Sequence, residues 1–208
     1  MKKFLAIVWI AASGHGAWAD GLDNLENFVK TVGTGRAEFT QVVTAPAREG
    51  QAGRSKMSSG TFVFSRPNRF SFLYRKPFEQ SIVADGQTLW LYDADLNQVT
   101  SHKQSAVLGS TPAALIAAAP DLRALQANFT LTNAPDKDGL QWVLALPKIK
   151  DGQLQSVRLG FRAGEKPAAR VGELAALEIF DSFGQRSLLN FNKFETNPSL
   201  AGDTFLFK

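Results

Sequence analysis

Cysteine is absent from this sequence of 208 residues, and histidine, methionine and tyrosine occur only twice each. Without cysteine, no disulfide can cross-link the chain, so the stability of the fold has to come from packing. The chain is long enough to bury a substantial core without such help. Phenylalanine, in contrast, is abundant, with 16 copies. The composition therefore predicts a domain that is held together by apolar and aromatic side chains.

Groups that could perform catalysis are also scarce. His102 is the only histidine after the first 19 residues, so a nucleophile and its base would have to include it. No Gly-x-Ser-x-Gly turn presents a serine, and no Gly-x4-Gly-Lys-Ser/Thr loop could hold a nucleotide. The pair Asp93 and Asp95 could suggest a metal, but two carboxylates without further ligands are typical of a solvated turn. The sequence predicts no enzyme, no catalytic residue, no cofactor and no metal site.

A strong surplus of either charge is missing as well. The chain has 23 basic and 19 acidic residues, and its formal net charge is +4. No run of five or more like charges occurs, which argues against a polybasic patch for a membrane surface. The near balance also argues against nucleic acid as a partner.

No apolar run is long enough to cross a membrane, because the longest candidate, residues 4–12, is less than half of the roughly 20 residues that a spanning helix needs. Lys2 and Lys3 precede this run, and Ala17-Trp18-Ala19 follows it. These are the three parts of a secretory signal peptide, with cleavage expected after Ala19. The next residue is Asp20 and not the cysteine of a bacterial lipoprotein, so we expect a soluble exported product, residues 20–208.

Two stretches show the spacing of helices. Apolar residues recur at positions 22, 25, 28, 29 and 32, and glycines follow that suit a C-terminal cap. The second stretch has a cap candidate at Thr111 and strong helix formers, and it stops at Pro120. Asp121 can cap a further short helix. We predict helices at 22–32 and across 111–127.

Elsewhere the apolar pattern has a period of two, which is typical of strands. Asp-Gly pairs at 85–86, 138–139 and 151–152 supply the positive φ angles of tight hairpin turns, so neighbouring strands should be antiparallel. Residues 45–59 are polar and predict a mobile loop. The candidate strands are 38–44, 60–65, 69–74, 80–84, 88–93, 97–102, 129–133, 140–146, 154–161, 174–181, 186–194 and 204–207. The sequence predicts one mainly β (α+β) domain with a meandering antiparallel sheet.

Alternation gathers aromatic side chains on one face of two neighbouring strands. These side chains are Phe62, Phe64, Phe70, Phe72 and Tyr74. They are consistent with two structures, an ordinary sandwich or barrel core and a ligand cavity, and periodicity does not decide between them.

The hairpin around residues 85–86 is apolar on both faces. We expect it to pair Ile82 with Leu89 on one face and to place Val83 and Trp90 on the other. Each of the two apolar faces has to pack against another part of the chain. A strongly curved sheet cannot fill its concave side alone, so the two predicted helical stretches are expected to close it as a lid.

The segment from residue 60 to residue 102 resembles the periplasmic outer-membrane lipoprotein carrier family, the LolA type. Its motifs, in the order of the family, are Gly60, Arg66-Pro67-Asn68, the aromatic strand 70–74, Pro77, and the hairpin Val83-Ala84-Asp85-Gly86 with Leu89-Trp90-Leu91-Tyr92-Asp93. Outside this segment, the first helix followed by Phe39-Thr40-Gln41 and the helix with Thr111-Pro112 and Leu115-Ile116 also fall in that order. The resemblance covers nearly all of the expected mature chain.

The resemblance implies an incomplete antiparallel β-barrel of about 11 strands, with a helical lid over a hydrophobic cavity that holds the acyl chains of a lipoprotein. It implies a monomeric carrier in the periplasm of a Gram-negative bacterium. Cargo would come from an inner-membrane ABC-type releasing complex and pass to an outer-membrane lipoprotein receptor. A carrier or sensor of the same fold for another amphiphile, such as a glycolipid, is the alternative.

By position, Arg66 resembles the family arginine that bonds to backbone carbonyls of the lid and keeps the empty form closed. An arginine has five donors and no acceptor, which suits carbonyls left without partners at the end of a helix. Phe70 resembles the aromatic residue at the cavity mouth. The residues expected to line the cavity are Phe62, Phe64, Phe70, Phe72, Tyr74, Trp90, Leu115 and Ile116. The sequence stops at residues 204–208, where family members often continue into a tail associated with one-way transfer.

Overall fold

The structure is a computed structural model, and it describes residues 20–47, 53–107, 114–149, 152–162 and 172–207. The predicted signal peptide, residues 1–19, lies outside the described residues. So does the predicted start of the second helical stretch, at residues 110–113.

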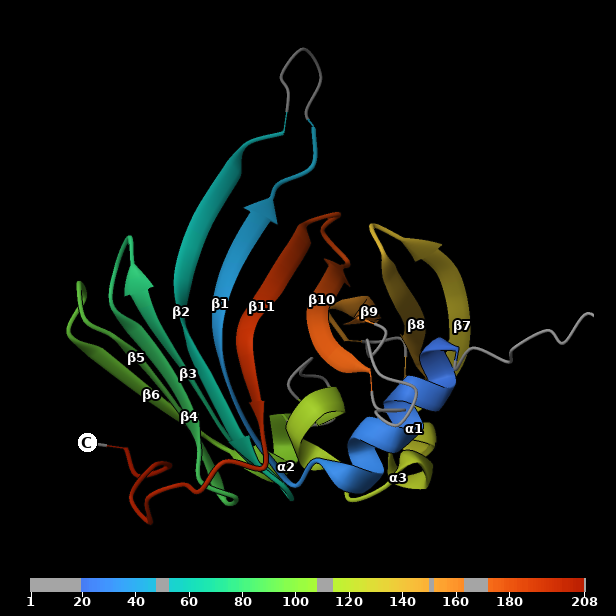
Figure 1. Ribbon diagram of the computed structural model, residues 1–208. Helices are drawn as coiled ribbons and strands as arrows, with labels where there is room; N and C mark the ends of the chain where they lie inside the picture. The colour runs from blue at the N-terminus through green and yellow to red at the C-terminus, as the bar shows by residue number, and fades with distance from the viewer. Residues whose placement is uncertain (1–19, 48–52, 108–113, 150–151, 163–171, 208) are drawn as a thin grey trace, which may run out of the picture.

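Eleven antiparallel strands form one meandering sheet (Figure 1). The strands are β1 (Thr34–Thr44), β2 (Ser55–Ser65), β3 (Arg69–Lys76), β4 (Gln80–Ala84), β5 (Thr88–Asp93), β6 (Gln98–Lys103), β7 (Phe129–Lys137), β8 (Leu140–Pro147), β9 (Leu154–Arg162), β10 (Glu173–Asp181) and β11 (Arg186–Thr196). Their order is β6-β5-β4-β3-β2-β1-β11-β10-β9-β8-β7, so the first and last strands of the chain pair in the middle. Because β6 and β7 are the two edges of the described sheet, the barrel is incomplete, as predicted.

The helical segments lie on the concave side of the sheet, toward one end of its strands (Figure 1). They are α1 (Gly21–Thr31), α2 (Gln104–Val107), η2 (Ala114–Ala118) and α3 (Leu122–Asn128). Asp20 caps α1 by accepting from the Asp23 N–H, and Asp121 caps α3 by accepting from the Ala124 N–H, as predicted for Asp121. The segment α1 packs on β7, β8, β9 and α3, whereas η2 packs on β2 and β3.

Part of the predicted loop 45–59 is strand, because β2 begins at Ser55. Ser55 pairs with Thr44, and Met57 pairs with Val42. Ladder hydrogen bonds are made by the backbone, so a polar segment beside an apolar strand can still extend the sheet. The prediction failed here because it rested on side-chain polarity alone.

The register of the hairpin that joins β4 to β5 also differs from the prediction. Ala84 pairs with Leu89, and Ile82 pairs with Leu91 rather than with Leu89. The connection contains residues 85–87, and the Asp85 carboxylate accepts from the Gln87 and Thr88 N–H groups within this turn. Ile82 and Leu89 lie on the same face, as predicted. The connection between the two strands is longer than a two-residue turn, so the partner of Ile82 is two residues further along β5.

The core lies between the concave face and the helices, and phenylalanine is its commonest residue in the described part of the chain. Phe28 of α1 contacts rings from three strands, at 6.0 Å from Phe64, 5.9 Å from Phe161 and 6.0 Å from Phe194. Phe39 of β1 pairs across the sheet with Phe191 of β11. Packed rings therefore join the first helix to both halves of the sheet.

The predicted strand 204–207 is wrong, because the chain forms a turn there. The Thr204 N–H donates to the Ala201 carbonyl, and the Leu206 N–H donates to the Asp203 carbonyl, each at 3.1 Å. Phe205 is buried, and Phe207 stacks on Trp90 at 5.1 Å between ring centroids. Phe207 covers the outer face of β5 at Trp90 and Tyr92, and the Phe205 ring lies 5.5 Å from Cζ of Arg69 on β3. The C-terminal segment therefore covers the outer face of the sheet instead of extending it.

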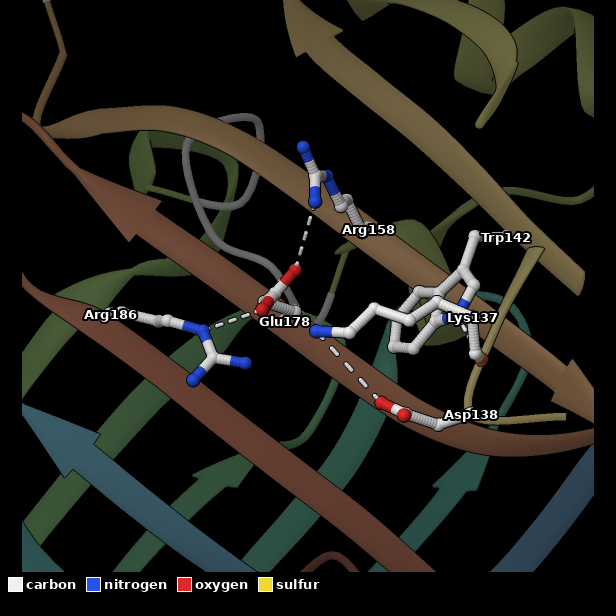
Figure 2. Close-up of polar contacts among 6 residues, drawn as sticks. All are labelled: Lys137, Asp138, Trp142, Arg158, Glu178 and Arg186. Atoms are coloured by element: carbon white, nitrogen blue, oxygen red, sulfur yellow. Dashed lines mark hydrogen bonds and ion pairs between the residues drawn. The ribbon is translucent and has the colours of Figure 1, made fainter. Parts of the chain in front are cut away.

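The outer face of β9, β10 and β11 carries a charged cluster (Figure 2). Glu178 is only 6% exposed and accepts from Arg186 Nε at 2.5 Å and from Arg158 Nη1 at 3.4 Å. Its neighbours Leu177 and Ile179 face the concave side, so Glu178 faces away from it. The cluster ties three strands together on the side of the sheet opposite to the core.

Candidate functional site

A cavity of about 240 Å³ lies on the concave side of the sheet. Its walls come from β1, β3, β4, β5, β10 and β11, and its lining is almost entirely apolar. The lining residues are Gln41, Phe70, Phe72, Tyr74, Ile82, Leu89, Leu91, Leu177, Ile179 and Leu189.

The exposure of the lining residues shows where the cavity opens. Phe70, Leu89 and Leu177 are buried, whereas Tyr74, Leu91 and Ile179 on the same strands are half-buried. In each of these strands the half-buried residue is nearer to the turn that joins β3 to β4, β5 to β6 or β10 to β11. The cavity therefore opens toward that end of the sheet, and the helices lie toward the other end (Figure 1).

The predicted cavity residues are distributed over three environments. Phe70, Phe72 and Tyr74 line the cavity, although Phe70, expected at its mouth, is 2% exposed and lies at its deep end. Phe62 and Phe64 share that face but are fully buried, since Phe62 stacks on Phe72 at 4.3 Å. They pack beside the cavity wall, within the core.

The two predicted lid residues, Leu115 and Ile116, lie in η2 and are fully buried in the core cluster. Trp90 is different, because it lies between the cavity-lining Leu89 and Leu91 and therefore points to the outer face, where it meets Phe207. The prediction that Trp90 lines the cavity is wrong. The β4–β5 hairpin that contains Trp90 is apolar on both faces, and the sequence did not show which of the two faces the cavity.

The sequence interpretation missed the wall contributed by β10 and β11. Leu177, Ile179 and Leu189 face the cavity from these strands. The β10 segment carries apolar residues on both faces, so alternation does not identify its inner face. Only the pairing of β1 with β11 brings Leu177 and Leu189 opposite β3 and β4.

Arg66 lies in the turn between β2 and β3 and contacts the end of α1. Its Nη1 donates to the carbonyl oxygens of Val32 and, at 3.4 Å, of Phe28. Its backbone N–H donates to the Gly33 carbonyl at 2.8 Å. The Phe28 carbonyl also accepts from the Val32 N–H at 3.0 Å, so the guanidinium is its second donor, and it binds the Val32 carbonyl just beyond the last residue of α1.

The surroundings of the Arg66 guanidinium are otherwise aromatic. Its Cζ lies 4.8 Å from the centroid of the Phe28 ring and 5.1 Å from that of Phe64, which are favourable positions for a cation. Burial lowers the pKa of Arg66 to about 10, so the group stays charged at neutral pH. Its Nε and Nη2 are buried without a hydrogen-bond partner in the described part of the chain.

Asn68, in the same turn, contacts the second half of the lid. Its N–H donates to the Ala117 carbonyl of η2 at 2.9 Å, and its carbonyl accepts from the side chain of Gln104. Gln104 is buried, and its Oε1 accepts from the Gly86 N–H at 3.0 Å. One turn thus connects the sheet to both α1 and η2. Sequence reasoning assigned no contact to Asn68, although its φ of 67° is of the kind that asparagine tolerates.

Polar groups are rare in the cavity wall. Tyr74 Oη donates to Gln41 Oε1 at 3.0 Å, and Ser58, opposite Gln41 on β2, lies 3.4 Å from the same oxygen. The Tyr74 ring packs edge to face on Phe39 at 5.1 Å. Burial raises the pKa of Tyr74 to about 12, so its hydroxyl is neutral at physiological pH.

Large apolar side chains are exposed on the turns around the opening. Phe78, Leu96, Ile149 and Phe183 are each 64 to 70% exposed. They lie in the connections after β3, β5, β8 and β10. Because all neighbouring strands are antiparallel and β1 pairs with β11, these four connections fall at the same end of the sheet. We call these four residues the apolar rim.

The described residues contain no group of three or more potential metal ligands and no helix that could span a membrane. Asp93 accepts from the Leu96 N–H at 3.2 Å and so closes a turn. His102 is exposed on the edge strand β6.

An open, curved sheet with an apolar cavity on its concave side and helices toward one end is suited to sheltering an apolar ligand. The family model described as "Outer membrane lipoprotein carrier protein LolA" matches residues 30–208. The chain belongs to this family. Its function is that of a periplasmic lipoprotein carrier and not of an enzyme, as the sequence predicted.

Individual relatives agree with this assignment. The outer-membrane lipoprotein carrier protein of Albidiferax ferrireducens is 73% identical over 206 residues, which are 99% of this chain and 95% of that protein. The protein of the same name from Methylibium petroleiphilum is 50% identical over 203 residues, 96% and 92% of the two chains.

Solved structures show the same fold at low identity. A LolA superfamily protein from Nitrosomonas europaea has a TM-score of 0.50 and 12% identity, over 87% of this chain and 94% of that one. A DUF1329 family protein from Desulfovibrio piger has a TM-score of 0.53 and 10% identity, over 88% and 94%.

Proposed function

We propose that this protein carries lipoproteins by enclosing their acyl chains in the cavity, with α1 and η2 as a lid. The observation that carries the proposal is the combination of an apolar cavity, open at one end, with a lid that one turn of the sheet holds at the other. We also propose that residues 1–19 direct export and are removed after Ala19, which leaves residues 20–208 as a single domain.

The size of the cavity supports a lid that moves. Pockets for ligands of drug size usually enclose about 300–1,000 Å³, whereas this cavity encloses about 240 Å³. The acyl chains of a lipoprotein need more room than this. We therefore take the described arrangement as a closed form and propose that loading displaces the helices from the concave face.

Arg66 is the proposed latch of the closed form. Hydrogen bonds to charged groups contribute roughly 1.5–3 kcal/mol each. Bonds from one guanidinium to the last carbonyls of α1 are thus strong enough to favour closure and weak enough to be broken by cargo.

A carrier also has to release what it binds. Burying three acyl chains of about 15 methylenes would contribute on the order of 35 kcal/mol at roughly 0.8 kcal/mol for each methylene. Measured affinities stop near 18–21 kcal/mol. A loosely packed cavity, and the free energy needed to open the lid, keep the net affinity far below the value for complete burial of the acyl chains. The cargo can therefore pass on to a site that binds it more tightly.

We propose an inner-membrane ABC-type complex as the source of cargo and an outer-membrane lipoprotein receptor as its destination. The sequence has no phosphate-binding loop, so energy for loading would enter through the partner. The apolar rim lies on turns at the opening and offers apolar contacts to acyl chains that enter or leave the cavity.

Mass spectrometry of the protein isolated from the periplasm tests the cargo. Co-purified lipoproteins are expected, and a glycolipid in their place would favour a carrier of another amphiphile. A second assay measures hand-over of a loaded lipoprotein to outer-membrane vesicles. Isolation without any acylated molecule, together with no hand-over, would contradict the proposal.

A further inference from the structure

One pair of polar side chains interrupts the apolar wall of the cavity. Of the ten lining residues, Gln41 and Tyr74 are polar, and they bond to each other at 3.0 Å. Both are half-buried, which places them at the opening and not at the deep end. The polar pair therefore lies where a ligand's polar end would remain when its apolar part is inserted.

The hydrogen bonds of Gln41 leave part of its amide free. Its Oε1 faces two hydroxyls, those of Tyr74 and Ser58. Its Nε2 has no hydrogen-bond partner among the described residues. Gln41 Nε2 is not among the buried side-chain atoms that lack a partner, so it is open to water at the cavity opening, and the acceptor of a ligand can take the place of that water.

We infer that the Gln41 amide, positioned by Tyr74, donates a hydrogen bond to the carbonyl oxygen of an acyl linkage. The inference rests on the proposed function, because it takes an acyl chain as the ligand. The carbonyl is the only polar group of a fatty acyl chain and stands at its head. When the chain contacts Phe70 and Leu177 at the deep end, its head lies toward the opening.

Two properties of the pair suit this role. Tyr74 is held by its ring contact with Phe39, and Ser58 approaches Gln41 from the neighbouring strand, so the amide plane is fixed from two sides. A carbonyl accepts and does not donate, and Nε2 donates and does not accept. The subsite therefore selects an acyl group over a bare hydrocarbon and sets how deeply the bonded chain enters.

The test is a cycle of two proteins and two ligands, measured by calorimetry. The proteins are the wild type and Gln41→Leu, and the ligands are a triacylated lipopeptide and its analogue with ethers in place of the ester carbonyls. Gln41→Leu is expected to weaken the ester ligand about three- to tenfold, the effect of one neutral hydrogen bond. Its effect on the ether ligand should stay below about twofold if the ester is the acceptor.

A third ligand, which lacks the amide-linked chain, distinguishes the two possible sources of the carbonyl. If Gln41→Leu weakens the ester and ether ligands equally but has no effect on this one, the acceptor is the amide carbonyl. Tyr74→Phe should reduce the same discrimination in part. Thr40→Val changes a polar side chain on the opposite face of β1 and should leave all three affinities unchanged.

The outcomes separate this inference from the proposed function. A wild type that binds none of the three ligands overturns both. A wild type that binds all of them, with Gln41→Leu retaining each affinity within twofold, overturns only the carbonyl subsite. Thermal unfolding of each variant confirms that a loss of binding comes from a folded protein.

Discussion

Arg66 brings a positive charge between two aromatic rings and the end of a helix. Its bonds to Val32 and Phe28 favour a closed lid, but its Nε and Nη2 are buried without partners among the described residues. An unsatisfied buried donor costs about 1–3 kcal/mol, which offsets part of what the two bonds contribute. The net free energy of closure at this residue is therefore small. A small value suits a lid that has to open in every round of transfer.

Replacing Arg66 by leucine should open the lid and leave the sheet intact. Arg66→Leu removes the donors to α1 but keeps an apolar contact with Phe28 and Phe64. We expect faster amide hydrogen exchange in the last turn of α1 and a hand-over of lipoprotein reduced at least several-fold. Arg69→Leu is the matched control, because Arg69 lies in the same region but contacts Ser65 and the Phe205 ring. Equal hand-over by Arg66→Leu and the wild type would refute the latch.

Tyr74 predicts a pH dependence of stability. Burial raises its pKa to about 12 in the folded protein, whereas an unfolded tyrosine ionises near 10. The folded state favours the neutral phenol. The stabilisation that this preference gives is fully present below pH 10 and is lost between about pH 10 and 12. The loss should be on the order of 2 kcal/mol.

The measurement is the free energy of unfolding of the wild type and of Tyr74→Phe in urea from pH 9 to pH 12. Lysines titrate in the same range in both proteins, so the difference between the two curves isolates Tyr74. As the pH rises, the wild type should lose stability relative to Tyr74→Phe. A constant difference would show that the phenol ionises normally.

At the scale of single elements, β5 serves two surfaces. Leu89 and Leu91 face the cavity, whereas Trp90 and Tyr92 meet Phe207 of the C-terminal segment on the outer face. The same alternation that builds a cavity wall therefore also attaches the end of the chain. The binding site and the outer cover share a strand but no side chain.

Two adjacent alanine substitutions should separate these surfaces. Leu91→Ala removes part of the cavity wall and should weaken the binding of a hydrophobic dye several-fold. Trp90→Ala removes the stack with Phe207 and should lower the free energy of unfolding by about 2 kcal/mol, because Trp90 is only partly buried. Dye titration and urea unfolding of both variants provide the check. A large loss of dye affinity in Trp90→Ala would return Trp90 to the cavity.

At the scale of the whole molecule, the two ends of the sheet differ in their roles. The end near the helices is held by the Arg66-Pro67-Asn68 turn, and the opposite end exposes the apolar rim around the opening. Exposed apolar groups that gather at one place on a surface commonly mark an interaction site. The arrangement separates the part of the molecule that closes from the part that meets a partner.

A triple variant, Phe78→Ser with Leu96→Ser and Phe183→Ser, should reduce lipoprotein hand-over several-fold without lowering the melting temperature. These side chains are exposed, so their loss leaves no cavity in the core. Leu206→Ser is the control, since Leu206 is 60% exposed in the C-terminal segment. Hand-over by the triple variant at the wild-type rate would exclude a role for the rim.

Local patterns predicted the elements wherever the chain decides its conformation over a few residues. The Asp85-Gly86 turn, the Asp121 cap and the aromatic alternation of β3 all depend on near neighbours. The prediction failed at 204–207, because the same alternation served to cover a sheet and not to extend it. The prediction also missed that residues 55–59 are strand. These residues are mostly polar, and they extend the sheet because their backbone pairs with residues 40–44 of β1.

The sequence by itself determined most of the strands, the first helix, the aromatic face of β2 and β3, and the position of Arg66 in its turn. Only the tertiary structure decided which apolar face encloses space. Leu177 and Leu189 became cavity wall, and Trp90 became an outer contact, through the pairing of β1 with β11 and the docking of the C-terminal segment. The reason is physical: periodicity separates two faces of a strand, but contacts between residues far apart in the chain determine which of them becomes the inside.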